Sequence, residues 1–165
     1  MKVNRLFLKL NEKEVMEEDI DFSSGFSDPN HVKKINSCHV KLELVEYGDV
    51  LECDMYLNAD VIASCAYTLD DVPYKVKVHE KMYFSSEEDD KDSDTIYYEP
   101  ENEINFDDYA LSYIIANVPH HLHKPGAKLP AGGNGYRVLT EDDLAKERSE
   151  GKKSSPFDCL DDLDL

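Results

Sequence analysis

The chain has few basic residues and no long apolar run. Its 165 residues include 36 Asp and Glu against 18 Lys and Arg, which gives a formal net charge of -18. Such a field repels phosphate backbones and anionic membranes over roughly a Debye length, about 8 Å at physiological salt. The composition therefore disfavours nucleic-acid binding by the whole surface, and neither DNA nor a membrane is an expected partner.

Cysteine is also scarce, and the four cysteines show no paired spacing: Cys38, Cys53, Cys65 and Cys159. Three of them lie in or beside strand patterns, which favours buried thiols in a reducing compartment over a disulfide framework. The first ten residues alternate apolar and charged side chains, so neither a signal peptide nor a transmembrane helix is expected. These features predict a cytoplasmic protein.

The clearest pattern in the chain is a run of alternating apolar residues over 51–65. Successive side chains of a strand point to opposite faces, so one face receives eight apolar residues: Leu51, Cys53, Met55, Leu57, Ala59, Val61, Ala63 and Cys65. A strand of this length should bend, and 58–60 is the expected place. Shorter alternating runs at 40–44 and 74–82, joined to it through turns at 47–49 and 69–73, predict an antiparallel meander.

One face of such a meander must be covered, and a helix from Phe106 to Val118 is the expected cover. Asn105 is a suitable N-cap, Asp107 follows in the first turn, and Pro119 ends the helix. The predicted fold class is α+β: an antiparallel β-meander, which could curl toward a barrel, covered by one main helix and followed by a partly flexible C-terminal tail. Residues 1–140 are expected to form a single domain, with a short helix, a linker and a Pro-Phe segment in 141–165.

The remaining segments give weaker signals. Residues 1–10 predict a further strand, 11–22 an acidic turn or short helix, 85–94 a solvated acidic loop and 95–98 a short strand. Residues 31–36 are too short for a prediction. Thr140, with Asp143 at the capping-box position, predicts a short helix that gives way to a linker over 147–155.

Two patterns resemble metal sites and are better explained otherwise. Four acidic residues occupy calcium-loop positions, Asp90, Asp92, Asp94 and Glu101, but Thr95 stands where the turn needs glycine and neither flank predicts a helix. A zinc site could be imagined from Cys65 with His120, His121 and His123, but Thr68 stands where a second cysteine would be needed. An acidic loop and an exposed polar loop are the preferred interpretations.

No catalytic constellation can be assembled from the sequence. Residues 132–135 are glycine-rich but lack the Lys-Ser/Thr that a phosphate-binding loop requires, and no nucleophile pairs with a base. We therefore expect no enzymatic activity, no cofactor and no metal.

The order of the segments resembles the YceD family, the large ribosomal RNA subunit accumulation proteins of bacteria and plastids. The residues that carry the resemblance span most of the chain: Val61-Ile62-Ala63-Ser64-Cys65 and its turn, the helix from Ile104-Asn105-Phe106 to Val118-Pro119, the loop Gly133-Asn134-Gly135-Tyr136-Arg137-Val138 with Glu141-Asp142, and Ser155-Pro156-Phe157 with Leu160. Many members have a Cys-x-x-Cys at the strand end, of which this chain keeps only Cys65. Tyr136 and the missing cysteines resemble the branch found in low-GC Gram-positive bacteria.

The resemblance implies a non-enzymatic ribosome-biogenesis factor that supports accumulation or processing of large-subunit (23S) ribosomal RNA. The charge implies that it docks locally on pre-ribosomal RNA, or on the particle through a basic ribosomal protein. Residues 120–153 are the sizeable net-positive region, and the candidate contacts there are Lys124, Lys128 and Arg137, with Pro156 and Phe157 as an apolar anchor. The alternative is an acidic protein–protein interaction module or a metal-binding protein unrelated to ribosomes.

Overall fold

The computed structural model describes residues 1–22, 31–130, 132–133 and 135–150, so the predictions for Pro156 and Phe157 lie outside the described residues. The chain divides into two compact units, Met1–Pro125 and Gly126–Leu165. The first unit carries two β-sheets and the helix α1 (Phe106–Asn117), and the second carries the helix α2 (Glu141–Glu150). This architecture confirms the α+β class. No helix of the described segments is long and apolar enough to cross a membrane.

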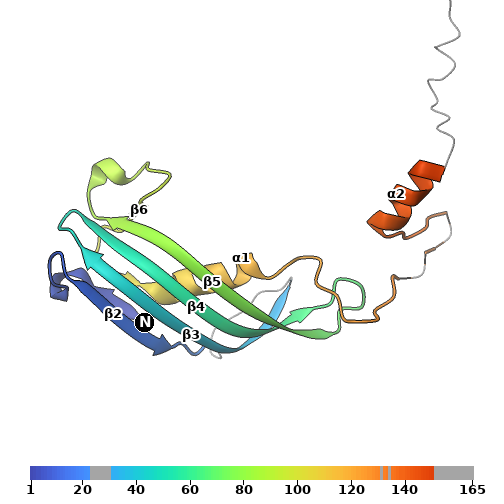
Figure 1. The fold of residues 1–165 in the computed structure, drawn as a ribbon, viewed down its shortest axis with the longest axis horizontal. Helices are drawn as coiled ribbons and strands as arrows, with labels where there is room; N and C mark the ends of the chain where they lie inside the picture. The colour runs from blue at the N-terminus through green and yellow to red at the C-terminus, as the bar shows by residue number, and fades with distance from the viewer. Residues whose placement is uncertain (23–30, 131, 134, 151–165) are drawn as a thin grey trace, which may run out of the picture. The chain divides into compact units, whose positions relative to one another are not determined.

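The main sheet has five strands in the order β2-β3-β4-β5-β6 (Figure 1). Its centre is the predicted meander of three 15-residue antiparallel strands, β3 (Val32–Glu46), β4 (Val50–Ser64) and β5 (Asp71–Ser85). The edges are β2 (Lys13–Asp19), which is antiparallel to β3, and the two-residue β6 (Tyr97–Tyr98), which is parallel to β5. The described strand order ends at β2 and β6, so the closure toward a barrel is not found.

The alternation of β4 is confirmed residue by residue. Its predicted apolar face, from Leu51 to Ala63, is buried at every second position, and Cys65 just beyond the strand is buried as well. A bend or bulge was expected within 58–60 of this strand; β4 pairs with β5 there without a register shift, whereas its pairing with β3 is irregular next to Asp60. The irregularities lie in the partner strand β3, between Val32 and Lys34 and between Ile35 and Ser37.

Three boundary predictions are wrong, each because of a long-range contact. Residues 11–22 contain the edge strand β2, which pairs with β3 from Lys13↔Val45 to Asp19↔His39. The strand expected over 1–10 is only β1 (Lys2–Asn4), which pairs with β7 (Glu103–Asn105) in a separate small sheet and is followed by the 3-10 turn η1 (Arg5–Phe7). Pro73 lies inside β5 rather than in a turn, at a part of the strand that pairs with β4 and not with β6.

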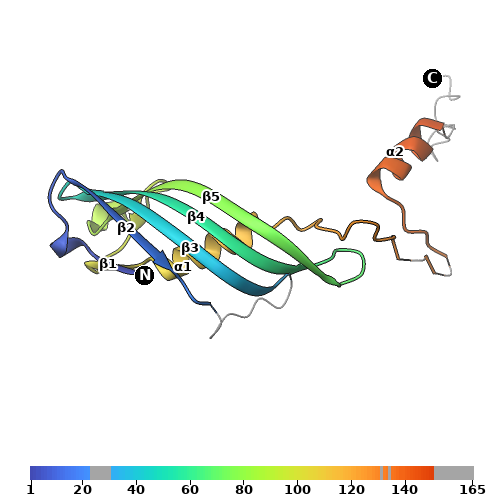
Figure 2. The ribbon, with the colours of Figure 1, turned by 60° about the horizontal axis from the view of Figure 1, so that its bottom comes forward.

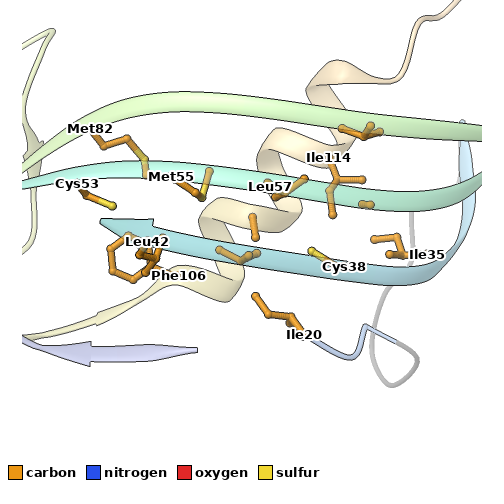
Figure 3. Close-up of a cluster of buried hydrophobic side chains, with 14 of the residues drawn as sticks. Ile20, Ile35, Cys38, Leu42, Cys53, Met55, Leu57, Met82, Phe106 and Ile114 are labelled. Carbon is orange, nitrogen blue, oxygen red and sulfur yellow. The ribbon is translucent and has the colours of Figure 1, made fainter. Parts of the chain in front are cut away.

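Helix α1 covers one face of the main sheet, as predicted. The side chain of Asn105 accepts a hydrogen bond from the Asp107 N–H, and the helix ends before Pro119. Phe106, Ala110 and Ile114 are buried, and Figure 3 shows Phe106 and Ile114 among side chains of β3, β4 and β5. Phe84 meets the rings of Phe106 and Tyr109 edge-on at 5.5 and 5.2 Å, contacts worth about 0.5–1.5 kcal/mol each beyond their burial.

The acidic loop and the short C-terminal helix are also present. Residues 85–94 include the 3-10 turn η2 (Glu88–Asp90). The Thr140 hydroxyl accepts a hydrogen bond from the Asp143 N–H at 3.0 Å, which confirms the predicted cap of α2. The helix continues to Glu150, so the linker expected from residue 147 does not begin there, and the rest of that prediction lies outside the described residues.

Candidate functional site

The predicted cationic segment leaves α1 at Pro119 and runs to α2 without a helix or strand in its described residues. Within it, an isolated antiparallel β-bridge pairs Gly133 with Tyr136. Three prolines, Pro119, Pro125 and Pro130, remove backbone donors and oppose regular structure. Most described side chains from 119 to 138 are exposed, so the segment presents its charges to solvent.

The three candidate cations are exposed and distributed over the two units. Lys124 belongs to the first unit and its Nζ lies 3.7 Å from a carboxylate oxygen of Asp70. Lys128 and Arg137 belong to the second unit, where the Arg137 guanidinium donates two hydrogen bonds to Glu147 at 2.9 and 3.0 Å. Exposed ion pairs are worth about 0–1 kcal/mol, so a phosphate could replace either carboxylate at little cost.

The loop 119–124, which contains His120, His121 and His123, contacts the turn that follows β4. The ring of His123 stacks on Tyr67 with centroids 5.1 Å apart, and His31 Nε2 lies within hydrogen-bond distance of the Pro119 carbonyl at 2.7 Å. The backbone N–H of Lys124 donates to Cys65 Sγ at 3.4 Å. The structure thus brings Cys65 to the loop that contains the three histidines, as the zinc hypothesis would require.

The thiol of Cys65 takes part in hydrogen bonds, and within the described residues it does not belong to a group of metal-ligating side chains. The Thr68 side chain and then the Lys124 N–H lower its pKa to about 7. Burial instead raises the pKa of Cys53 to about 12 and that of Cys38 to about 11. Across 1–22, 31–130, 132–133 and 135–150, no three His, Cys, Asp or Glu side chains converge as metal ligands.

The calcium-like loop is closed by its own polar groups. Ser93 Oγ accepts hydrogen bonds from the N–H groups of Thr95 and Ile96 at 3.3 and 3.2 Å, and the Ser93 N–H donates to the Asp90 carbonyl at 3.0 Å. Serine side chains form such local turns without an ion. The loop is therefore stabilised by hydrogen bonds among its own residues.

The sheet face opposite α1 is polar, and its charges pair with one another. Lys41 pairs with Glu43 within β3 at 2.8 Å, and cross-strand ion pairs join Lys81 to Glu52 at 2.7 Å and Lys75 to Asp60 at 3.5 Å. Hydrogen bonds from Lys13 and Lys41 lower the pKa of Glu43 to about 2. Carboxylates of the same face therefore neutralise Lys41, Lys75 and Lys81.

A group of exposed apolar side chains was not anticipated from the sequence. The strand expected over residues 1–10 would bury Leu6 and Leu10, yet Leu6 is 71% exposed, and its neighbour Phe7 is 83% exposed. The sequence does contain a sign that the strand ends early. In a strand Arg5 and Phe7 would lie on the same face, although one is charged and the other is apolar. A large exposed apolar pair on a folded segment is a feature of binding surfaces.

Comparisons with family models, with curated proteins and with solved structures found no match to this chain. The resemblance to the YceD family therefore stays a prediction.

Proposed function

We propose that this chain is a non-enzymatic ribosome-biogenesis factor that acts in the bacterial cytoplasm and supports accumulation or processing of 23S ribosomal RNA. The resemblance described above supplies the class of process. The observation that carries the mode of action is the segment 120–140, which contains Lys124, Lys128 and Arg137 and no Asp or Glu, in a chain whose net charge is -18.

The segment suits local contact with RNA phosphates. It is exposed and has little regular structure, so it can follow an irregular single-stranded or looped backbone. Surface ion pairs hold Lys124 and Arg137, and contact with phosphate releases condensed counterions, which favours binding at moderate salt. Pro156 and Phe157, farther along the sequence, would add an apolar anchor.

The first prediction concerns salt dependence. Replacing Lys124, Lys128 and Arg137 together with Ser should lower association with large-subunit precursors and flatten its salt dependence. Each lost phosphate contact changes the slope of log K against log salt by about 0.7 on single strands, so three lost contacts should change it by about 2. Sedimentation of the protein with precursors at several salt concentrations measures both effects.

Two control variants make this experiment specific. Replacing three exposed lysines of the polar sheet face, Lys34, Lys75 and Lys77, with Ser removes the same charge and should leave the slope unchanged. Replacing Phe157 with Ala should weaken association without altering the slope, because no charge is lost. Equal sedimentation of parent and triple variant at every salt concentration would reject this segment as the RNA contact.

A further inference from the structure

One end of the first unit exposes four large apolar side chains on two adjacent segments. Leu6, Phe7 and Leu10 belong to η1 and the loop after it, and Tyr47, which is 53% exposed, belongs to the β3–β4 turn. Both ribbon views show the blue η1 segment at the same end of the sheet as this turn and the yellow-green η2 segment (Figures 1 and 2). Leu6, Phe7, Leu10 and Tyr47 are called the apolar end surface below.

A buried ion pair joins the two segments. Arg5 is 7% exposed and Glu46 is 6% exposed, and the guanidinium donates to both carboxylate oxygens at 2.8 and 3.0 Å. Arg5 also donates to the Gly48 carbonyl at 3.3 Å, and the Gly48 N–H donates to Glu46 at 2.8 Å. Removing one partner of such a pair would leave a buried charge uncompensated, which is strongly destabilising, so the η1 segment is firmly attached to the turn.

Hydrogen bonds also fix the backbone around Leu6 and Phe7. The Asn4 side chain caps the Leu6 N–H at 3.0 Å, and the Arg5 N–H donates to the Asn102 carbonyl at 2.8 Å. The Asn11 N–H donates to the Glu46 carbonyl at 2.8 Å, where Asn11 adopts a positive φ of 57° that asparagine tolerates. Apolar side chains on a preorganised backbone lose little entropy on binding, which favours a docking role.

The charge around this surface is negative after its cations are counted. Each of the four nearby cations already has a carboxylate partner: Lys2 with Glu103, Arg5 with Glu46, Lys9 with Glu12 and Lys13 with Glu43. Glu14, Asp49 and Glu101 add further negative charge. The adjoining segment 87–108 holds eleven acidic residues and one lysine, a net charge of -10 out of -18 for the whole chain.

These charges select among possible occupants. A second copy of the chain would bring another charge of -18, and RNA or an anionic membrane would bring more negative charge to an acidic rim. A protein with a basic surface meets the rim with opposite charge, which steers association and orients the complex. An apolar centre with a charged rim is also the usual anatomy of a protein interface.

We propose that the apolar end surface docks a basic protein, with Leu6 and Phe7 in an apolar pocket of the partner and with its lysine and arginine side chains opposite the carboxylate rim. This interface is separate from the RNA contact proposed above. The choice of candidate partners rests on the proposed function, because the abundant basic proteins of a large-subunit precursor are its ribosomal proteins.

The test measures binding of the full chain to each purified basic protein of the large ribosomal subunit. At least one should bind with a Kd of about 1 µM or below. The variant Leu6→Ser/Phe7→Ser should weaken that binding at least tenfold, whereas Leu69→Ser, which removes a leucine that is also 71% exposed, should not. The variant Glu14→Gln/Glu101→Gln should weaken it and flatten its salt dependence, whereas Asp70→Asn/Asp71→Asn at the other end of β5 should not. Equal melting temperatures establish that all variants fold.

Four results would overturn the proposal. The first is that none of the proteins binds, and the second is that the parent and Leu6→Ser/Phe7→Ser bind equally. The third is that this variant loses binding to protein-free large-subunit RNA and not to a basic protein. The fourth is that it loses self-association and not binding to a basic protein. Sedimentation with precursors distinguishes the two hypotheses. If it persists while no purified protein binds, only this proposal fails, and if it is absent while a basic protein binds through Phe7, only the proposed function fails.

Discussion

The acidity of Cys65 depends on the turn that surrounds it. Its thiol is fully buried, yet hydrogen bonds to Thr68 and to the Lys124 N–H favour the thiolate and bring the pKa to about 7. Cys53 lies on the same sheet face without such donors, and burial raises its pKa to about 12. The pKa values of these two thiols, twelve positions apart in the sequence, thus differ because hydrogen bonds lower one and desolvation by burial raises the other.

Thr68→Val should raise the pKa of Cys65 toward the ordinary value of about 8.5, because valine keeps the shape and removes the donor. The pH dependence of thiolate ultraviolet absorbance, taken as the difference between each protein and its Cys65→Ser derivative, measures this pKa. Thr95→Val, at another exposed threonine, should leave the midpoint near 7. An unchanged midpoint in Thr68→Val would show that the hydroxyl does not stabilise the thiolate.

At the scale of elements, the stability of the first unit depends on α1 as the cover of the meander. Ile114 is 0% exposed within the core, and its neighbour Ile115 is 37% exposed on the same helix. The two positions have the same helix propensity and differ in burial. They therefore separate the contribution of packing from that of the helix itself.

Ile114→Asp should unfold the first unit, since an unpaired buried carboxylate costs about 3–5 kcal/mol and the lost burial of the isoleucine adds about 2–5 kcal/mol, a sum comparable with a typical stability of about 5–15 kcal/mol. Ile115→Asp introduces the same residue at an exposed position and should change the free energy of unfolding by about 1 kcal/mol or less. Circular dichroism during thermal unfolding measures both. Similar melting of Ile114→Asp and the parent would mean that α1 is not the cover.

Elements with one strongly apolar face were predictable, and so was the short edge strand β6, but the polar edge strand β2 was not. The alternation from Leu51 to Ala63 and the Asn105 cap identified β4 and α1 because burial and capping leave local patterns. β2 has no buried residue and owes its pairing to ladder contacts with β3 and to the charge pair of Lys13 with Glu43, which is distant in sequence. The exposure of Leu6 likewise depends on the Arg5–Glu46 pair, whose members are 41 positions apart.

At the scale of the whole molecule, charge is distributed unevenly along the chain. Residues 87–108 carry a net charge of -10, whereas 120–140 contains three cations and no acidic residue. The proposed function assigns the RNA contact to the cationic segment, and the apolar end surface beside the acidic segment is assigned to a basic protein. The sequence predicted the first segment from composition alone, but the second surface required the tertiary contacts of η1.

Depletion of the protein from growing cells tests whether it supports accumulation of 23S ribosomal RNA. The measured quantity is the ratio of mature large-subunit to small-subunit ribosomal RNA after depletion, compared with cells that re-express the parent chain. We expect that this ratio falls and that re-expression restores it. A ratio that stays equal to that of undepleted cells would mean that the protein does not support accumulation of 23S ribosomal RNA.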